Sequence, residues 1–404
     1  MMGTVSWTRG HGPLMPFADG FRRHLIGLGY PPGSAKHQLD LMGQLDRWLT
    51  AEDLAVGEVT QQICAQFLAA RRVGGQRRVP TLVSLAPLVD YLTAQGVSAA
   101  EPVPAPTDRD VLLARYHHHL VDERGLTRTT VVRYERFARR FLAHRAACAG
   151  TDIGMERLSS QEVNAYLLEA TSHLVVASAK REAADLRSLL RFLYFDGLLD
   201  TDLGIAMPPV ASWRGTSLPS TMGAAQVNTV LDGCDRATTS GRRDYAILTL
   251  LARLGLRSGE VAALQLGDID WAAGEILVRG KARRQDRLPL PVEVGEALVA
   301  YLKDGRPRCD RPELILTVYA PPRPIHPSSI TNVVYRACRR AGLDRVGGHR
   351  LRHALATEML RQGRTLIEIA QVLRQSDLAT TSGYAKVDRA ALRTVAQPWP
   401  GTAR

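Results

Sequence analysis

The chain has few cysteines and no long apolar run, and each shortage excludes a class of protein. The five cysteines are scattered, odd in number and never arranged as a C-x-x-C pair, which argues against a disulfide framework and a thiolate zinc site. No apolar stretch approaches the roughly 20 residues that a membrane span requires. The N-terminus also lacks the charged and apolar regions of a signal peptide. We therefore expect a cytoplasmic protein with no membrane partner.

Acidic residues are outnumbered, since 40 Asp and Glu face 52 Lys and Arg, which gives a net charge of +12. This balance favours an anionic partner, because each neutralised phosphate releases counterions. Nucleic acid is the first candidate and an acidic membrane surface the second. The excess is mainly arginine, so genomic base composition is an alternative source of it. A content of 45% hydrophobic and 23% charged residues is typical of globular domains, and 404 residues suffice for two or three.

Two proline-rich stretches, residues 101–107 and 208–219, divide the sequence. Proline at this density cannot continue a helix or a central strand, so both read as linkers. We expect three domains, at residues 1–105, 106–209 and 210–404.

The first two segments look like diverged copies of one small helical unit. Each has apolar residues three and four apart, followed by a glycine suited to cap a helix C-terminus. The alternative is that any two amphipathic helical bundles align this well by chance. The matching pieces are residues 21–25 with 116–120, the helix ends Trp48-Leu49 with Phe141-Leu142, and residues 85–97 with 186–198.

The third segment predicts a mixed α+β domain that is mainly helical. Helices are expected at residues 244–254 and 260–264, and again from residue 330 onward. Between them, residues 274–279 and 287–291 flank a polar, basic turn and read as a β-hairpin. The whole chain is therefore expected to be mainly α, with one small β-sheet near its C-terminal part.

Arg257 is the first candidate for chemistry in this segment. Gly255 ends one predicted helix and Ser258 can cap the next, which would place the Arg257 guanidinium beside amide donors suited to a phosphate oxygen. Taken alone this signal is weak, and an ordinary surface arginine is the better explanation of the residue.

His349, Arg352 and His353 follow two glycines and open a predicted helix. Residues three apart share a helix face, so His349 and Arg352 can reach one phosphate together, whereas His353 points elsewhere. A His-x-x-x-His zinc pair is the competing interpretation. No nearby carboxylate or cysteine completes that site.

Thr365 and Glu368 form a capping box that opens a short helix. The helix leads through Gln375 to Tyr384, which follows small, hydroxyl-rich residues from which its phenol could swing toward a substrate. An isolated tyrosine in such a loop would normally be a packing residue.

In combination these motifs resemble the tyrosine recombinase family, which includes phage integrases, chromosome-dimer resolvases and transposon recombinases. The motifs are Leu-Arg-Ser-Gly-Glu, a hairpin Gly-Lys, His-x-x-Arg-His and Ser-Asp-Leu-Ala-Thr-Thr-x-x-Tyr, in this order along the third segment. The resemblance implies a catalytic domain at 210–404, a helical, SAM-like core-binding domain at 106–209 and an N-terminal helical DNA-binding domain at 1–105.

The resemblance also implies the catalytic roles. Tyr384 would attack the scissile phosphate and form a 3′-phosphotyrosine, while Arg257 and Arg352 clamp that phosphate. His349 would act as general base, and Lys281 would protonate the leaving 5′-oxygen.

Further residues would support this chemistry. Gln375 stands where the family usually has His or Trp, and its amide can still donate to a phosphate oxygen. Glu260 matches a position that the family fills with an acidic residue, so we expect it to orient the site, with His353 also in a supporting position. The arginines expected to bind DNA are Arg279, Arg283 and Arg284.

The implied partners are double-stranded DNA at specific sites and further copies of the chain, as a tetramer on DNA. Accessory recombination proteins are a further possible partner, and neither a metal nor another cofactor is expected. We expect action at the nucleoid, on a mobile element. Two alternatives stay open: a type IB topoisomerase, and a DNA-binding accessory protein that has lost efficient catalysis, for which Gln375 is the only hint. The tail at residues 390–400 could dock on a neighbouring subunit or on its own domain.

Overall fold

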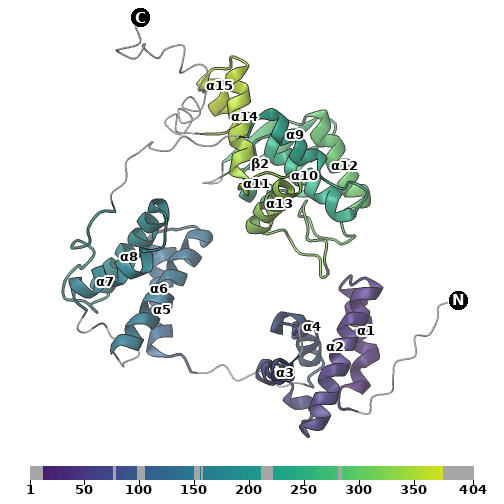
Figure 1. Cartoon of the computed structure of the whole chain (residues 1–404), viewed down its shortest axis with the longest axis vertical. Coiled ribbons are helices and arrows are strands. Elements are labelled where there is room, and N and C mark those ends of the chain that lie inside the picture. Colours follow the sequence, from purple (N-terminus) through teal and green to yellow (C-terminus); the bar gives the residue numbers. More distant parts are fainter. Residues whose placement is uncertain are drawn as a thin grey trace, which may run out of the picture. The chain divides into compact units, whose positions relative to one another are not determined.

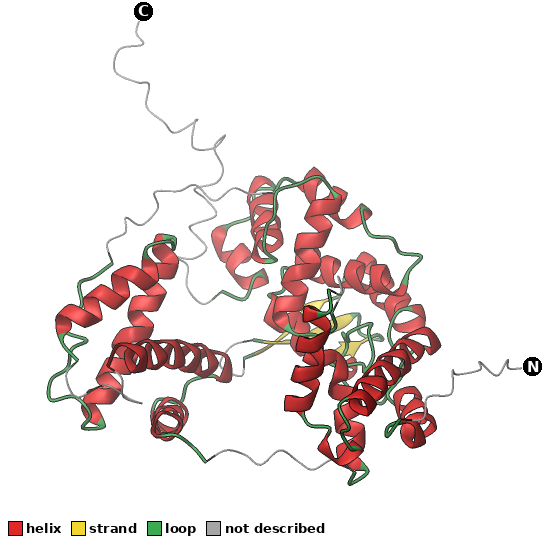
Figure 2. Cartoon of the chain, turned by 60° about the horizontal axis from the view of Figure 1, so that its bottom comes forward, coloured by secondary structure: helices red, strands yellow, loops and turns green. Residues whose placement is uncertain are grey.

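The computed structural model describes residues 12–75, 79–97, 105–149, 155, 158–210, 222–280 and 284–375. In these ranges the chain is mainly helical with one small sheet, which confirms the predicted fold class (Figures 1 and 2). Pro102–Thr216 forms one compact unit, and Met1–Glu101 with Ser217–Arg404 forms the other. Among the described helices, none is long and apolar enough to cross a bilayer.

The N-terminal segment is a small bundle around its own hydrophobic core. Its helices are α1 (Ala18–Gly27), α2 (Pro32–Ala51), α3 (Gln61–Val73) and α4 (Leu82–Ala94), with short 3-10 turns at Met15–Phe17 and Val56–Glu58. Thr60 caps α3 by accepting a hydrogen bond from the Ile63 backbone N–H. Gly96 has a φ of +70°, which confirms the predicted glycine at the end of α4.

The second segment is also helical and surrounds a separate core. Its helices are α5 (Asp108–His118), a π-helical turn η3 (His119–Glu123), α6 (Arg128–Ala149), α7 (Ser160–Thr171) and α8 (Val176–Phe195). Gly197, with a φ of +76°, ends α8 as predicted. The prediction that the second helix ends at Phe141-Leu142 is wrong. The helix α6 continues to Ala149, and beyond Leu142 it buries Arg145, which donates to Glu162 of α7 at 2.8 Å.

The central helix of the third segment is α10 (Thr239–Arg253), which is buried on nearly every side. The helices α12 (Val292–Asp304), α13 (Pro327–Arg340) and α14 (His349–Arg361) pack against it, and α11 (Ser258–Ala263) follows it directly. The remaining elements are α9 (Ala224–Asp232), the 3-10 turn η4 (Leu266–Asp268) and α15 (Leu366–Val372). Thr365 and Glu368 form the capping box of α15 that the sequence predicts.

The predicted hairpin is present in an antiparallel sheet of order β1-β2-β3. Its strands are β1 (Ile269–Asp270), β2 (Glu275–Arg279) and β3 (Gln285–Pro289). Pairing of Arg279 with Gln285 and of Ile276 with Leu288 sets the register. The basic turn between β2 and β3 is closed by a hydrogen bond from the Gly280 N–H to the Arg284 carbonyl at 2.7 Å.

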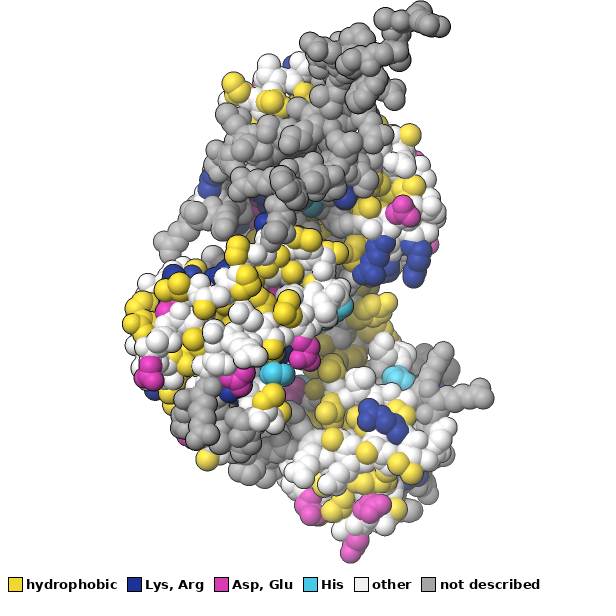
Figure 3. All heavy atoms as spheres, turned by 60° about the vertical axis from the view of Figure 1, so that its left-hand side comes forward, with side chains coloured by type: hydrophobic (Ala, Val, Ile, Leu, Met, Phe, Trp, Pro, Cys, Tyr) yellow, Lys and Arg dark blue, Asp and Glu magenta, His cyan; other side chains and the backbone are white. Residues whose placement is uncertain are grey.

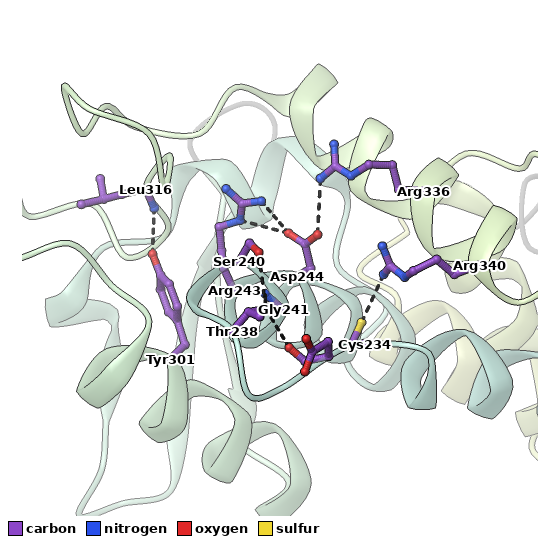
Figure 4. A network of polar contacts seen from close by, with 11 residues as sticks. Cys234, Thr238, Ser240, Gly241, Arg243, Asp244, Tyr301, Leu316, Arg336 and Arg340 are labelled. Carbon is purple, nitrogen blue, oxygen red and sulfur yellow. Dashed lines mark hydrogen bonds and ion pairs between the residues drawn. The ribbon is translucent and has the colours of Figure 1, made fainter. Parts of the chain in front are cut away.

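A polar network fixes α10 against its neighbours (Figure 4). Arg243 donates twice to Asp244 Oδ1, at 3.0 and 2.7 Å, and Arg336 of α13 reaches Asp244 Oδ2 at 3.3 Å. The Tyr301 hydroxyl of α12 accepts from the Leu316 backbone N–H at 3.0 Å. The buried Asp244 carboxylate and the buried Tyr301 hydroxyl are thus both paired, which avoids the cost of an unpaired polar group in the core.

Candidate active site

Arg257 lies at the junction between α10 and α11, and 43% of its side chain is exposed. Gly255 makes the sharp junction with a φ of +58°, a value that favours glycine. The prediction that Ser258 caps α11 is wrong by one residue. Arg257 is the N-cap residue, because the Glu260 carboxylate reaches back and accepts from the Arg257 backbone N–H at 2.8 Å.

Glu260 is buried between two arginines. Its Oε1 accepts from Arg257 Nη1 at 2.6 Å, and its Oε2 accepts from Arg374 Nη2 at 2.9 Å. Burial works to raise the pKa of Glu260, but the Arg257 backbone N–H and the charges of Arg374 and Arg257 outweigh it and hold that pKa below its ordinary value. Glu260 is therefore an anion that contacts both the backbone and the guanidinium of Arg257.

Arg352 lies on α14 and is completely buried. Its guanidinium donates to the backbone carbonyls of Gly255 and Leu373, which belong to the α10–α11 junction and to the end of α15. The residue thus holds together the segment before Arg257 and the segment before Gln375. In this arrangement Arg352 fixes the frame of the site rather than offering its guanidinium to solvent.

His349 is the first residue of α14, and its ring lies edge-on against that of His353 at a centroid distance of 4.4 Å. The expectation that His353 points away from His349 is therefore wrong, because residues four apart also share a helix face. Burial, together with the nearby charges of Arg352 and Arg257, lowers the pKa of His349. Burial and His349 lower the pKa of His353 to about 4. Both imidazoles are thus neutral near neutral pH, the form that can accept a proton.

The starts of α11 and α14 meet, which brings the predicted groups together. A Cβ atom on Gly348 would lie 3.0 Å from Ser258 Oγ, so glycine allows the two helix ends to approach. The influence of Arg257 on the pKa of His349 shows the same proximity. Two pairs that are far apart in the sequence, Arg257 with Glu260 and His349 with Arg352, therefore form one cluster.

The hairpin arginines are held by carboxylates. Arg279 pairs with Asp268, and Arg284 Nε lies 3.0 Å from Asp286 Oδ1 with half of its side chain exposed. Lys281 and Arg283 lie outside the described residues.

Gln375 closes the described part of the chain, and its backbone N–H donates to the Ala370 carbonyl at 2.9 Å. Tyr384 and the tail at residues 390–400 lie outside the described residues. The residue before Gln375, Arg374, was missed by the sequence analysis although it contacts Glu260 directly. The signal available was an arginine immediately after a helix end, where glycine is the usual residue.

The cluster combines a half-exposed guanidinium, a buried anion that holds it and a neutral imidazole beside it. These groups suit a reaction in which an anionic substrate gains further negative charge, because the guanidinium stabilises that charge and the imidazole can take up a proton. A phosphodiester under attack by a hydroxyl meets this description.

The model of the phage integrase family matches residues 220–390, a range that contains the cluster and Tyr384. The protein y4rA of Sinorhizobium fredii, which carries an integrase/recombinase name, is 37% identical over 401 residues, covering 97% of this chain and 96% of that protein. The tyrosine recombinase XerD of Mycobacterium tuberculosis is 32% identical over 306 residues, covering 72% of this chain and 96% of XerD. A solved lambda integrase tetramer bound to a Holliday junction shares the fold, with 17% identity, coverage of 76% and 87%, and a TM-score of 0.53.

Proposed function

Because this chain belongs to the phage integrase family of tyrosine recombinases, we propose that it breaks and rejoins DNA at specific sites through Tyr384. The observation that carries the proposal is the cluster of Arg257, Glu260, His349 and Arg352, assembled inside the range that matches the family. The nearly full-length match to y4rA supports an integrase of a mobile element.

The proposed chemistry is a pair of transesterifications. The Tyr384 oxygen forms a bond to phosphorus, the bond to the 5′-oxygen breaks, and a 3′-phosphotyrosine results. His349 takes the phenol proton, Lys281 gives a proton to the leaving oxygen, and Arg257 with Arg352 stabilises the phosphate charge. In the second step a 5′-hydroxyl of the partner strand attacks the phosphotyrosine and releases Tyr384. Bond energy is retained, so the cycle consumes no nucleotide.

The lowered pKa of His349 supports its role as the base. Gln375 would donate from its amide to a phosphate oxygen, and Glu260 would keep Arg257 aimed at that phosphate. Because Arg352 is fully buried, its contact with the phosphate requires an edge of its guanidinium to become exposed when DNA binds. Arg279 and Arg284 would contact DNA beside the site, together with Arg283.

We further propose that residues 1–105 and 106–209 are duplicated DNA-binding units. Buried residues of α2 correspond to buried residues of α6 that lie a constant number of positions later in the chain. Three contacts between aromatic rings in the first unit also have counterparts at the corresponding positions of the second. The buried pairs are Ala35 with Val131, Met42 with Ala138 and Leu45 with Phe141. The ring contacts are Phe21–Tyr91 and Tyr116–Phe192 (5.5 and 4.9 Å), His24–Tyr91 and His119–Phe192 (both 5.3 Å), and Trp48–Phe67 and His144–Tyr166 (5.7 and 4.9 Å).

In this alignment of the two units, Phe141 corresponds to Leu45 rather than to Trp48. The alignment suggested by sequence alone was therefore shifted by about one helical turn, an easy error because amphipathic helices repeat their pattern every turn. The π-helical turn His119–Glu123 accounts for the one extra residue between Tyr116 and Gly125, compared with Phe21 and Gly29.

The two units differ in the charges of their second helices. The exposed side of α6 carries a series of arginines, of which Arg139 and Arg140 are 59% and 55% exposed. The equivalent positions of α2 carry neither arginine nor lysine. The arginines of α6 are Arg133, Arg136, Arg139 and Arg140, and their counterparts are His37, Asp40, Gly43 and Gln44. Figure 3 shows that Lys and Arg side chains form separate groups on the face drawn, rather than one continuous stripe.

We therefore assign the phosphate contacts of the second unit to α6. The first unit would use a different face, where Arg47 and Arg71 flank an open pocket lined by Trp48 and Phe67. The Arg71 guanidinium lies 5.4 Å from the centre of the Phe67 ring. Aromatic rings next to arginines suit contact with nucleic acid, through stacking and through phosphate pairing.

Salt titration of DNA binding tests this assignment. Replacing Arg136 and Arg139 with alanine should reduce the slope of log K against log salt by about two, since each phosphate contact contributes about one. Replacing His37 with alanine in the first unit is the matched control and should leave the slope unchanged, because His37 does not line the pocket of Arg47 and Arg71. An unchanged slope in the Arg136 and Arg139 variant would contradict the assignment to α6.

We propose that the active form is a tetramer on two DNA sites, at the nucleoid. The lambda integrase tetramer that shares the fold supports this assembly, and the tail at residues 390–400 is a candidate contact between subunits. Accessory proteins would act on the same assembly.

Strand exchange between two duplexes tests the proposed function. Duplexes that the wild-type chain selects from a random-sequence pool would be labelled differently and incubated with it, without metal or nucleotide. We expect four-way junctions and recombinant duplexes. Relaxation of supercoiled DNA without junctions would indicate a topoisomerase, and binding without cleavage would indicate an accessory protein. Either result would overturn the proposal.

A further inference from the structure

Arg374 has a backbone conformation that arginine seldom adopts. Its φ is +53°, and among the described residues other than glycine only Asp53 shares a positive φ. This region is unfavourable for L-residues with long side chains, and glycine is the usual choice directly after a helix. The turn is fixed by hydrogen bonds from the Arg374 and Gln375 N–H groups to the Gln371 and Ala370 carbonyls, at 3.0 and 2.9 Å.

The side chain of Arg374 is as unusual as its backbone, because only 3% of it is exposed. Its Nη1 donates to the Val372 carbonyl at 3.2 Å, and its Nη2 donates to Glu260 Oε2 at 2.9 Å. The same carboxylate oxygen accepts from the Arg257 backbone N–H at 2.8 Å. Glu260 is thus shared between Arg374 on one side and Arg257 on the other.

The turn that carries Arg374 also holds the other arginine of the site. The Leu373 carbonyl accepts a hydrogen bond from Arg352. One short segment, Leu373 to Gln375, therefore touches Arg352 through its backbone and Arg257 through Glu260. This segment leads directly to the part of the chain that contains Tyr384.

We infer that Arg374 is a positioning residue for strand cleavage, which holds Glu260 in place and thereby sets the Arg257 guanidinium relative to the chain that delivers Tyr384. The inference rests on the proposed function. Strained backbone persists where the surroundings require it, and it is common at functional sites. An arginine kept where glycine would fit more easily indicates that its side chain is needed there.

The test measures single-turnover formation of the covalent DNA adduct by the full-length chain. The DNA is a duplex that the wild-type chain has selected from a random-sequence pool, nicked so that cleavage is trapped. Arg374→Gly removes the guanidinium and relieves the backbone, Arg374→Gln keeps a polar side chain without charge, and Arg374→Lys restores the charge. Arg364→Ala is the matched control, because it removes an exposed arginine that lies 3.9 Å from Glu368 on the neighbouring helix.

We expect Arg374→Gly and Arg374→Gln to slow adduct formation at least about tenfold, as loss of one oriented charge at a reacting phosphate does. DNA affinity should be unchanged, Arg374→Lys should recover part of the rate, and Arg364→Ala should match the wild type. With Arg374 absent, Glu260 loses a cation and its pKa rises, so the fall in rate on acidification should begin at a higher pH. Combining Arg374→Gly with Glu260→Gln should slow the reaction no more than the slower single variant.

A rate equal to that of the wild type in both Arg374→Gly and Arg374→Gln would overturn the inference. A slowing that follows a loss of melting temperature, or that adds to the effect of Glu260→Gln, would also overturn it. Should Arg374→Gly not fold, Arg374→Gln and Arg374→Lys decide the matter alone. If the wild type forms no adduct, the proposed function itself fails, which distinguishes the two outcomes.

Discussion

Gly255 controls the junction that aims Arg257, so replacing it with alanine should damage both stability and cleavage. Its φ of +58° is unfavourable for alanine. The added Cβ would lie 2.7 Å from Leu373 Cδ2 and 3.1 Å from Leu355 Cδ2. The Gly255 carbonyl also accepts from Arg352, so any shift of the junction moves that arginine.

Two costs add at this position. The left-handed conformation costs alanine about 1–2 kcal/mol. Overpacking of a closed site costs about 1–3 kcal/mol. The sum is about 2–5 kcal/mol, and for a domain of this size each kcal/mol lowers the melting temperature by about 2–4 °C. We therefore expect Gly255→Ala to lower the melting temperature by roughly 4–20 °C.

Differential scanning calorimetry of the full chain measures this loss, with two glycine variants as controls. Gly342 has a positive φ of +68° but open space around a Cβ, so Gly342→Ala should show the conformational cost alone. Gly259 has open space and no positive φ, so Gly259→Ala should change little. If Gly255→Ala had the same melting temperature as Gly259→Ala, the close approach of Gly255 to Leu373 would be refuted. If its melting temperature equalled that of Gly342→Ala, overpacking at Gly255 would contribute nothing to the loss of stability.

Three further predictions concern the side chains of the site. Because the pKa of His349 is lowered, its imidazole stays neutral at pH values below about 6.5, the ordinary pKa of histidine. The cleavage rate at about pH 5.5 should therefore fall by less than the roughly tenfold loss expected for a histidine with an unshifted pKa, and a pH–rate profile checks this. The folded-state pKa of His353 is about 4. The unfolded chain therefore binds more protons between that pH and about 6.5, and stability falls as the pH falls through this window. Between about pH 7 and pH 5, the melting temperature of His353→Gln should fall less than that of the wild type. An equal fall would contradict the lowered pKa of His353. Gln375→Ala should slow adduct formation about tenfold whereas Gln375→His should not, because only the alanine variant lacks a hydrogen-bond donor; equal rates for the wild type and the alanine variant would exclude a role for the amide.

Local patterns were enough to predict several elements. The hairpin followed from two short stretches on either side of a polar, basic turn, although its second strand begins at Gln285 rather than at the predicted residue 287. The start of α15 followed from Thr365 and Glu368. The glycine ends of α4 and α8 followed from Gly96 and Gly197. Each of these depends on interactions between residues close together in the chain, which is why sequence alone sufficed.

Two errors arose within a single helical turn, where more than one local arrangement is available, and one residue was missed because its partner is distant in the sequence. Ser258 is a good capping residue, but Glu260 reaches back to Arg257 and takes over that task. His353 was expected to point away, yet one helical turn brings it against His349. Arg374 stands out in sequence only as an arginine directly after a helix end, and its contact with Glu260, which lies far away in the sequence, could not be predicted.

Trapping on a nicked duplex shows whether Tyr384 becomes covalently joined to DNA. The wild-type chain and Tyr384→Phe would be incubated with the duplex that the wild type selects, and the products separated on a denaturing gel. We expect a slow-migrating adduct for the wild type, with the tyrosine on a 3′-phosphate, and no adduct for Tyr384→Phe. An adduct that persists in Tyr384→Phe, or tight binding by the wild type with no adduct, would contradict this expectation.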